Sequence, residues 1–277
     1  MTCHFSSRNQ FNKGTNQPLT YPNKELNTEG VVSQRIGNHH NVPPPVCPGE
    51  EGFCEMMDEV MFVREDVIRG DWPADFLYRH FPWGDRLKRN FDPMCIPEPI
   101  MRAGVTTDMP EAAAQLVRMD WPTDLAISIY EILIETGVPL KEGMENDFVN
   151  NVVGFTAMLA MHLWDVIEKC FQVKWYYGAV RPEEYYGVSG CVFTSYSEGC
   201  PNHPGYIAGH GSLAGAIFAF LESIFDFSNH PEALEMVITA VYMFAQFRTL
   251  AGVHTAQDNI EGLKFGYRQD IKPIQKP

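Results

Sequence analysis

Apolar residues recur every three to four positions along most of the chain from residue 54 onward. This spacing is typical of α-helices that bury one face. It predicts helices over 56–70, 110–119, 123–136, 147–173, 209–226, 231–247 and 255–267. No alternation of apolar and polar residues lasts long enough to predict a sheet. We therefore expect an all-α fold, a helical bundle.

The longest predicted helix ends close to two basic residues. Lys174 stands at its end, and Gly178 and Pro182 prevent regular continuation of the helix. Arg181 is therefore expected at a helix exit or in a loop, where it is free to turn toward the same point as Lys174. A pair of solvated surface cations is the alternative for this block taken alone.

The first 50 residues differ in composition from the rest. Residues 1–50 are rich in Asn, Gln, Gly, Ser and Pro and have few apolar anchors. Such a segment cannot bury enough apolar surface to offset its ordering entropy, so we expect an extended or partly disordered N-terminal arm. Residues 51–277 are expected to form one helical catalytic domain, because a chain of 277 residues suits one large domain with an irregular extension.

Charge and hydropathy narrow the classes of partner and compartment. The formal net charge of −14 argues against nucleic acid, because phosphate backbones bind Lys and Arg. The most apolar stretches, 213–225 and 236–247, are too short to span a bilayer and are interrupted by Glu222 and Gln246. No signal peptide is visible at the N-terminus. We expect a soluble, cytoplasmic protein without a membrane span.

The seven cysteines show no metal-finger spacing. Reduced thiols are the expectation for an intracellular protein. Cys191 and Cys200 flank one loop, and they are the pair most able to form a disulfide.

Three short blocks carry the chemistry of the chain, and their letters are KWYYGAVRP, IAGHGS and FRTLAGVHTAQD. Together they supply three cations, a glycine amide and two imidazoles, which is what a tetrahedral oxyanion requires. The residues concerned are Lys174, Arg181, Gly209, His210, Arg248, His254 and Asp258.

The second and third blocks each have a local rationale. Gly209 and His210 begin a predicted helix, where unpaired N–H groups and the helix dipole favour an anion. Gly252 allows Arg248 to end one helix and His254 to begin the next. His254 and Asp258 then lie four residues apart on one face, so that the carboxylate can orient the imidazole. An ordinary surface His–Asp pair is the alternative for this block alone.

The order and internal spacing of the three blocks resemble the signatures of the vanadium-dependent haloperoxidases and the acid phosphatases of the type-2 phosphatidic-acid-phosphatase superfamily. That pattern is Lys-x6-Arg-Pro, then Pro-Ser-Gly-His, then Ser-Arg-x5-His-x3-Asp. The resemblance covers about residues 150–267, and the amino-acid sequence of the last two blocks is closer to that of the haloperoxidases.

The resemblance implies a role for each residue. Lys174, Arg181 and Arg248 would neutralise the oxygens of vanadate or phosphate, and the Gly209 amide would add a donor. His254 would be the axial vanadium ligand or, in a phosphatase, the phosphoryl-accepting nucleophile, oriented by Asp258. His210 would transfer protons to bound peroxide or to a leaving oxygen.

The sequence also departs from the pattern. Ala208 stands where the family has Ser, Ile207 replaces the Pro, and Phe247 replaces the Ser before Arg248. The hydroxyl missing at position 208 is an oxyanion donor, which typically contributes about 3–4 kcal/mol to transition-state stabilisation. Three nearby hydroxyls are candidates to replace it: Ser212, Thr249 and Thr255.

The leading hypothesis is therefore a vanadate-dependent enzyme of the haloperoxidase type. It would use hydrogen peroxide to oxidise a halide and so halogenate a small organic acceptor. One alternative is turnover of a phosphate or diphosphate ester, including an isoprenoid diphosphate, in the same pocket. Another is an oxyanion-binding protein without turnover. A homodimer is also an option, since the half of the chain that carries the motifs need not bury every helix face by itself.

Overall fold

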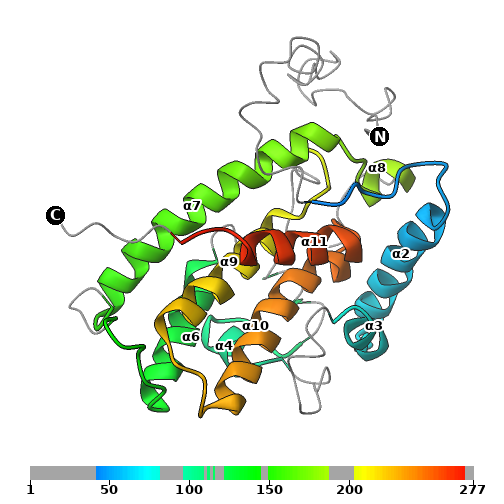
Figure 1. Ribbon diagram of the computed structural model, residues 1–277. Helices are drawn as coiled ribbons and strands as arrows, with labels where there is room; N and C mark the ends of the chain where they lie inside the picture. Colours follow the sequence, from blue (N-terminus) through cyan, green and yellow to red (C-terminus); the bar gives the residue numbers. More distant parts are fainter. Residues whose placement is uncertain are drawn as a thin grey trace, which may run out of the picture.

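The structure is a computed structural model, and it describes residues 42–81, 96–108, 111, 112, 115, 122–144, 149–186 and 203–271. Within these ranges the regular elements are helices, which confirms the all-α prediction; a single antiparallel bridge joins Leu140 to Phe225. The helices are α2 (Phe53–Arg69), α3 (Ala74–Arg79), α4 (Glu98–Arg102), α6 (Thr123–Glu135), α7 (Val152–Tyr177), α8 (Pro182–Tyr186), α9 (Gly209–Ile224), α10 (Pro231–Leu250) and α11 (Ala256–Tyr267) (Figure 1).

The long helix α7 runs along one side of the bundle (Figure 1). It begins at Val152, after Asn151, whose side chain caps the helix by accepting the N–H of Gly154 at 2.7 Å. Its inner face is apolar and fully buried from Phe155 to Val173. The helix continues one turn beyond the predicted end, so that Lys174 lies in its last turn, and it stops at Gly178 in the left-handed conformation.

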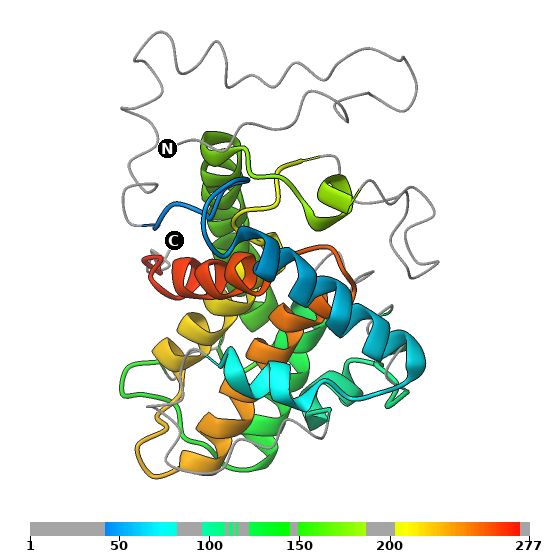
Figure 2. The same cartoon turned by 90° about the vertical axis from the view of Figure 1, so that its right-hand side faces the viewer.

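Helices α9 and α11 cross at backbone contact. Gly211 and Gly215 of α9 face Gly262 and Gly266 of α11, two pairs with the same four-residue spacing. A Cβ on Gly211 would lie 2.6 Å from the Asn259 carbonyl oxygen, and a Cβ on Gly262 would lie 2.6 Å from that of Ala208. Neither helix can carry a larger residue at these positions without moving. Figure 2 shows α11 running across α9.

The turn from α10 to α11 joins the two halves of the third sequence block. Arg248 lies in the last turn of α10, and Gly252 adopts φ +78°, which favours glycine. Thr255 then caps α11 by accepting the N–H of Asp258 at 3.1 Å, and the Asp258 carboxylate accepts the N–H of Thr255 at 3.0 Å. This reciprocal capping box fixes where α11 begins.

The N-terminal half packs against this core through α2, α3, α4 and α6. The Tyr242 hydroxyl of α10 donates to the carbonyl of Leu77 at 2.6 Å, and the Tyr177 hydroxyl of α7 donates to that of Val42 at 2.8 Å. Phe53 and Met57 of α2 form a small apolar cluster with Val180. Helix α2 therefore lies beside the loop that carries Arg181.

Several helices of the structure lie close to the positions predicted from the sequence. Helices α2, α6, α9, α10 and α11 lie where the apolar period placed them. The predicted loop over 183–206 instead begins within the short helix α8. Residues 1–41, most of the predicted helix at 110–119 and residues 187–202 lie outside the described ranges, so the boundary of the arm at residue 50 stays a prediction.

The cysteines correct one expectation. Cys47 is disulfide-bonded to a partner outside the described residues, so the prediction of reduced thiols is wrong for this cysteine. Cys54 and Cys170 are free thiols. The predicted pair of Cys191 and Cys200 lies outside the described ranges. In the part of the chain that the structure describes, no helix is long and apolar enough to cross a membrane.

The glycine crossing makes a direct prediction about stability. We expect Gly215→Ala and Gly266→Ala each to lower the free energy of unfolding by about 3 kcal/mol or more, because the new methyl would overlap a carbonyl oxygen of the facing helix. Denaturant unfolding followed by circular dichroism measures the change. Gly209→Ala is the matched control, since its Cβ would meet only ordinary contacts, the closest at 3.4 Å from Ile167. Equal stability of all three variants would contradict a backbone-contact crossing.

Candidate functional site

The structure brings together five residues from the first and third sequence blocks. Lys174 comes from the end of α7, Arg181 from the loop before α8, and Arg248 from the end of α10. His254 and Asp258 come from the turn into α11 and its first turn. All five are buried, with exposed fractions of 0–5%. We call these five residues the oxyanion site.

Backbone carbonyls hold two of the cations in place. Lys174 Nζ donates to the carbonyls of Pro204 and Gly205 at 3.0 and 2.9 Å. Arg181 Nε donates to the carbonyl of His203 at 2.8 Å, and its Nη1 donates to that of Val253 at 2.8 Å. The chain immediately before α9 and the turn before α11 are thereby tied to the same two side chains.

The pKa of Lys174 reflects its burial close to two other cations. Burial, together with the charges of Arg181 and Arg248, lowers the pKa of Lys174 to about 7, while Cys170 and Asp258 oppose the shift. Removing water from an ammonium group disfavours its charged form, and nearby cations act in the same direction. The site therefore favours an anion that would restore the balance of charge.

His254 is held as a neutral imidazole. Burial lowers its pKa well below the ordinary value, and the charges of Arg181, Lys174 and Arg248 add to the effect. Its Nδ1 lies 3.1 Å from Asp258 Oδ2, and its Nε2 lies 3.4 Å from Arg181 Nη1. Since a guanidinium can only donate, Nδ1 carries the proton and Nε2 presents its lone pair toward the cations.

Asp258 reaches His254 by a route that differs from the predicted one. His254 lies outside α11, one residue before the N-cap Thr255, so the two do not share a helix face. Instead, the carboxylate turns back over the start of α11, where Oδ2 accepts both the Thr255 N–H and the His254 ring. Burial raises the pKa of Asp258, opposed by the Thr255 N–H and the charges of Lys174 and Arg181.

His203 is a site residue that the motif did not single out. Arg181 Nη2 lies 3.2 Å from its Nδ1, and the same arginine binds its carbonyl, so one residue holds two edges of the guanidinium. Burial and the charges of Lys174 and Arg181 lower the pKa of His203, which keeps its ring neutral, and its Nδ1 also lies 3.1 Å from the Pro204 carbonyl. The sequence signal was its place at the start of the HPGYIAGHGS loop, seven residues before His210.

Gly209 and His210 begin α9, as the sequence predicted. The position of a Cβ on Gly209 lies 4.0 Å from Lys174 Cε, which places the start of α9 beside the lysine stem. The N-cap residue Ala208 makes no side-chain cap hydrogen bond. The His210 ring packs against Phe244 of α10, with ring centroids 5.4 Å apart.

None of the three hydroxyls considered as replacements for the missing serine is positioned for that role. Ser212 Oγ donates to the Ala208 carbonyl at 3.0 Å within α9. Thr255 Oγ1 caps α11. Thr249 Oγ1 accepts from Asn259 Nδ2 at 2.7 Å and lies 3.4 Å from Gln246 Oε1. Position 208 thus remains without a compensating hydroxyl among these residues.

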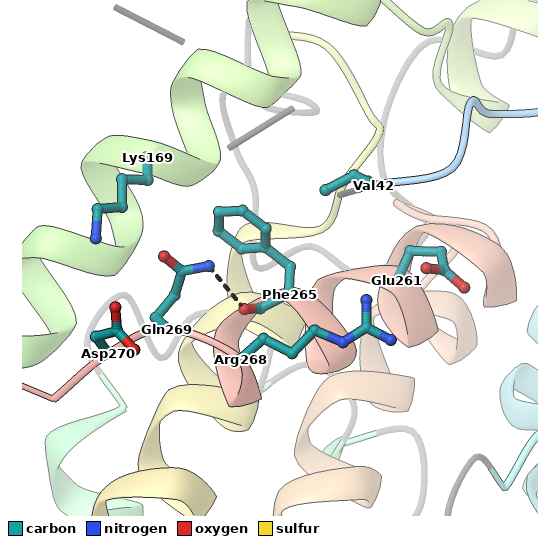
Figure 3. A pocket seen from close by; sticks show the side chains of 7 residues that line it. All are labelled: Val42, Lys169, Glu261, Phe265, Arg268, Gln269 and Asp270. Atoms are coloured by element: carbon teal, nitrogen blue, oxygen red, sulfur yellow. Dashed lines mark hydrogen bonds between the residues drawn. The ribbon is translucent and has the colours of Figure 1, made fainter. Parts of the chain in front are cut away.

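A separate surface pocket of about 460 Å³ lies between α7 and the end of α11 (Figure 3). Lys169 and Arg268 line it together with Glu261 and Asp270, so its charges are mixed, and Lys169 pairs with Asp165 at 2.7 Å. Gln269 turns back to donate to the Phe265 carbonyl (Figure 3). No residue of the oxyanion site lines this pocket.

Comparison with protein families matches residues 152–269 to the PAP2 superfamily. This segment of the chain is similar to that superfamily. It contains all five residues of the oxyanion site and Gly209 and His210. Among solved structures, the first bacterial vanadium-dependent iodoperoxidase is similar at 18% identity and a TM-score of 0.47, over 82% of this chain and 50% of that one. The present chain thus spans about half the length of that protein. No curated protein matches the sequence significantly.

The lowered pKa of Lys174 predicts that anion affinity depends on pH. Below pH 7 the free protein already carries the charged lysine, whereas above pH 7 binding must also take up a proton. The affinity for sulfate, whose charge is constant between pH 6 and 9, should fall by about tenfold per pH unit above 7. Calorimetric titration at several pH values measures this dependence.

Lys174→Met is the comparison variant for this experiment. It removes the titrating group and keeps most of the buried stem, so sulfate should bind more weakly and the steep decline above pH 7 should disappear. The same slope in this variant and in the unmodified protein would show that another group takes up the proton.

Proposed function

We propose that this protein is a vanadate-dependent enzyme of the haloperoxidase type, with the oxyanion site as its active centre. The observation that carries the proposal is the state of His254: a neutral ring, oriented by Asp258, whose Nε2 lone pair is directed to the side where Arg181 lies. An oxyanion that accepts this lone pair would lie among three cations.

The side chains suit vanadate in kind. Lys174, Arg181 and Arg248 are donors for anionic oxygens, and His254 Nε2 is a nitrogen ligand for the central atom. Vanadate would supply the activation of hydrogen peroxide for oxidation of a halide, and the oxidised halide would then react with an organic acceptor. His210, at the start of α9 beside the Lys174 stem, would transfer the proton that this chemistry requires.

Phosphate- or diphosphate-ester turnover is the second candidate, and the PAP2 superfamily match supports it equally well. In that reaction His254 Nε2 would attack phosphorus, the bond to the leaving oxygen would break, and His210 would protonate that oxygen. The same cations would stabilise the charge on the phosphoryl oxygens. One site serves both chemistries because bound vanadate resembles the five-coordinate state of phosphoryl transfer.

The activities separate in a single set of assays on vanadate-loaded and vanadate-free protein. Bromination of a phenolic dye in the presence of peroxide and bromide is expected only after loading. Phosphate release from simple esters without loading would instead select the second candidate. Tight uptake of vanadate with neither activity would leave an oxyanion-binding protein without turnover and overturn both enzymatic proposals.

His254→Ala should abolish vanadate uptake and both turnovers, because it removes the only proposed bond to the central atom. Equilibrium dialysis against vanadate and the two activity assays measure the effect. His230→Ala at the start of α10 is the control and should behave like the unmodified protein. Retained activity in the His254 variant would refute the role given to this residue.

Ala208→Ser should raise turnover, because it restores a hydroxyl at the N-cap of α9. One oxyanion donor contributes on the order of 10²–10³ to kcat, so a gain of up to about a hundredfold is expected. A serine at this position can also cap the helix and add about 1 kcal/mol of stability. Measurement of kcat and of the melting temperature distinguishes the role as oxyanion donor from the role as helix cap. A higher melting temperature with unchanged kcat would show that the hydroxyl only caps the helix.

A further inference from the structure

Helix α2, which precedes the segment similar to the PAP2 superfamily, places an arginine against the turn between Arg248 and His254. Arg64 packs its stem against Gly252: a Cβ on that glycine would lie 3.0 Å from Arg64 Cδ and 3.7 Å from its Nε. Gly252 lies between Arg248 and His254 in the α10–α11 turn. Two residues of chain span at most about 7 Å, so Arg64 flanks the backbone that presents His254.

Arg64 differs from Arg69 of α2, Arg79 of α3 and Arg102 of α4 in pairing with no carboxylate among the described residues. Arg69 pairs with Asp66, Arg79 with Glu59 at 2.9 Å, and Arg102 with Glu98 at 2.8 Å. In the described part of the chain no carboxylate pairs with Arg64. The sequence accounts for this, because the positions three and four residues away on α2 are all apolar: Val60, Met61, Val67 and Ile68.

The hydrogen-bonding capacity of Arg64 is also little used within the described residues. Its Nη1 donates to the sulfur of Met61 at 3.5 Å, a weak acceptor. Its Nε is buried and has no hydrogen-bond partner there. A buried donor without a partner costs free energy, and in a protein with 35 acidic and 21 basic residues a carboxylate would be the common solution. The guanidinium of Arg64 therefore has hydrogen-bond donors that a bound anion can accept.

We propose that Arg64 binds a second anionic group of the substrate, beside the anion held by the oxyanion site. The inference rests on the proposed function and specifies its substrate class: molecules with two anionic groups. In phosphoric-ester chemistry the second group is the other phosphate of a diphosphate. In halogenation it is a carboxylate or phosphate on the organic acceptor. A guanidinium suits either group, since its planar donors match their paired oxygens.

The test compares inorganic diphosphate with orthophosphate by calorimetric titration of the full chain at pH 6.5. The unmodified protein should bind diphosphate more tightly. Arg64→Met keeps an unbranched stem against Gly252 and removes the charge, so it should weaken diphosphate binding by about tenfold or more and change orthophosphate binding by less than about twofold. Arg64→Lys should recover part of the loss. Arg69→Met, on the same helix, is the matched control and should retain both affinities.

The outcomes distinguish this inference from the function on which it rests. Orthophosphate binding together with a diphosphate affinity that does not depend on Arg64 would overturn the inference alone. Equal weakening of both ligands in Arg64→Met would show that the residue only supports the turn, which also overturns it. Failure of the unmodified protein to bind either ligand would overturn the oxyanion-binding function and this inference with it.

Discussion

The backbone contact between α9 and α11 is the constraint on which the rest of the structure depends. Four glycines allow the two helices to approach until carbonyl oxygens of one face the Cα atoms of the other. Because α9 begins at Gly209 and α11 begins just after His254, this crossing determines how close the two motif blocks come. The Ala208 N–H donates to the Asp258 carbonyl at 2.9 Å, which joins the starts of the two helices directly. The site is thus positioned by packing that lies outside it.

Burying several cations together is unfavourable unless other groups compensate. Carbonyls of Pro204, Gly205, His203 and Val253 provide part of that compensation for Lys174 and Arg181. Asp258 provides one carboxylate, which also caps α11 and orients His254. Burial first, and the neighbouring positive charges second, lower the pKa values of Lys174, His203 and His254. In the proposed function, a bound oxyanion would offset the positive charge that these groups share.

The N-terminal half adds to the site without carrying any of its motif. Helix α2 contacts Val180, next to Arg181, and Gly252, near His254. It therefore borders two of the three loops that supply the site. In the proposed function, residues 152–269 would hold the oxyanion, and α2 would contact the rest of the bound molecule.

The sequence by itself determined most of the longer helices and supplied the candidate site residues. Periodic apolar positions placed α2, α6, α9, α10 and α11, since burial of one helix face leaves a local pattern. The spacing of the three blocks selected Lys174, Arg181, Arg248, His254 and Asp258 as candidates. The packing partners of those residues are not visible in any local pattern. Only the tertiary structure showed that the Asp258 carboxylate acts from a capping box, that His203 holds Arg181, and that Arg64 lies against Gly252. The residues in these contacts are far apart in the sequence. They meet only because the turn before α11, the chain leading into α9 and helix α2 pack together, and the whole core sets that packing.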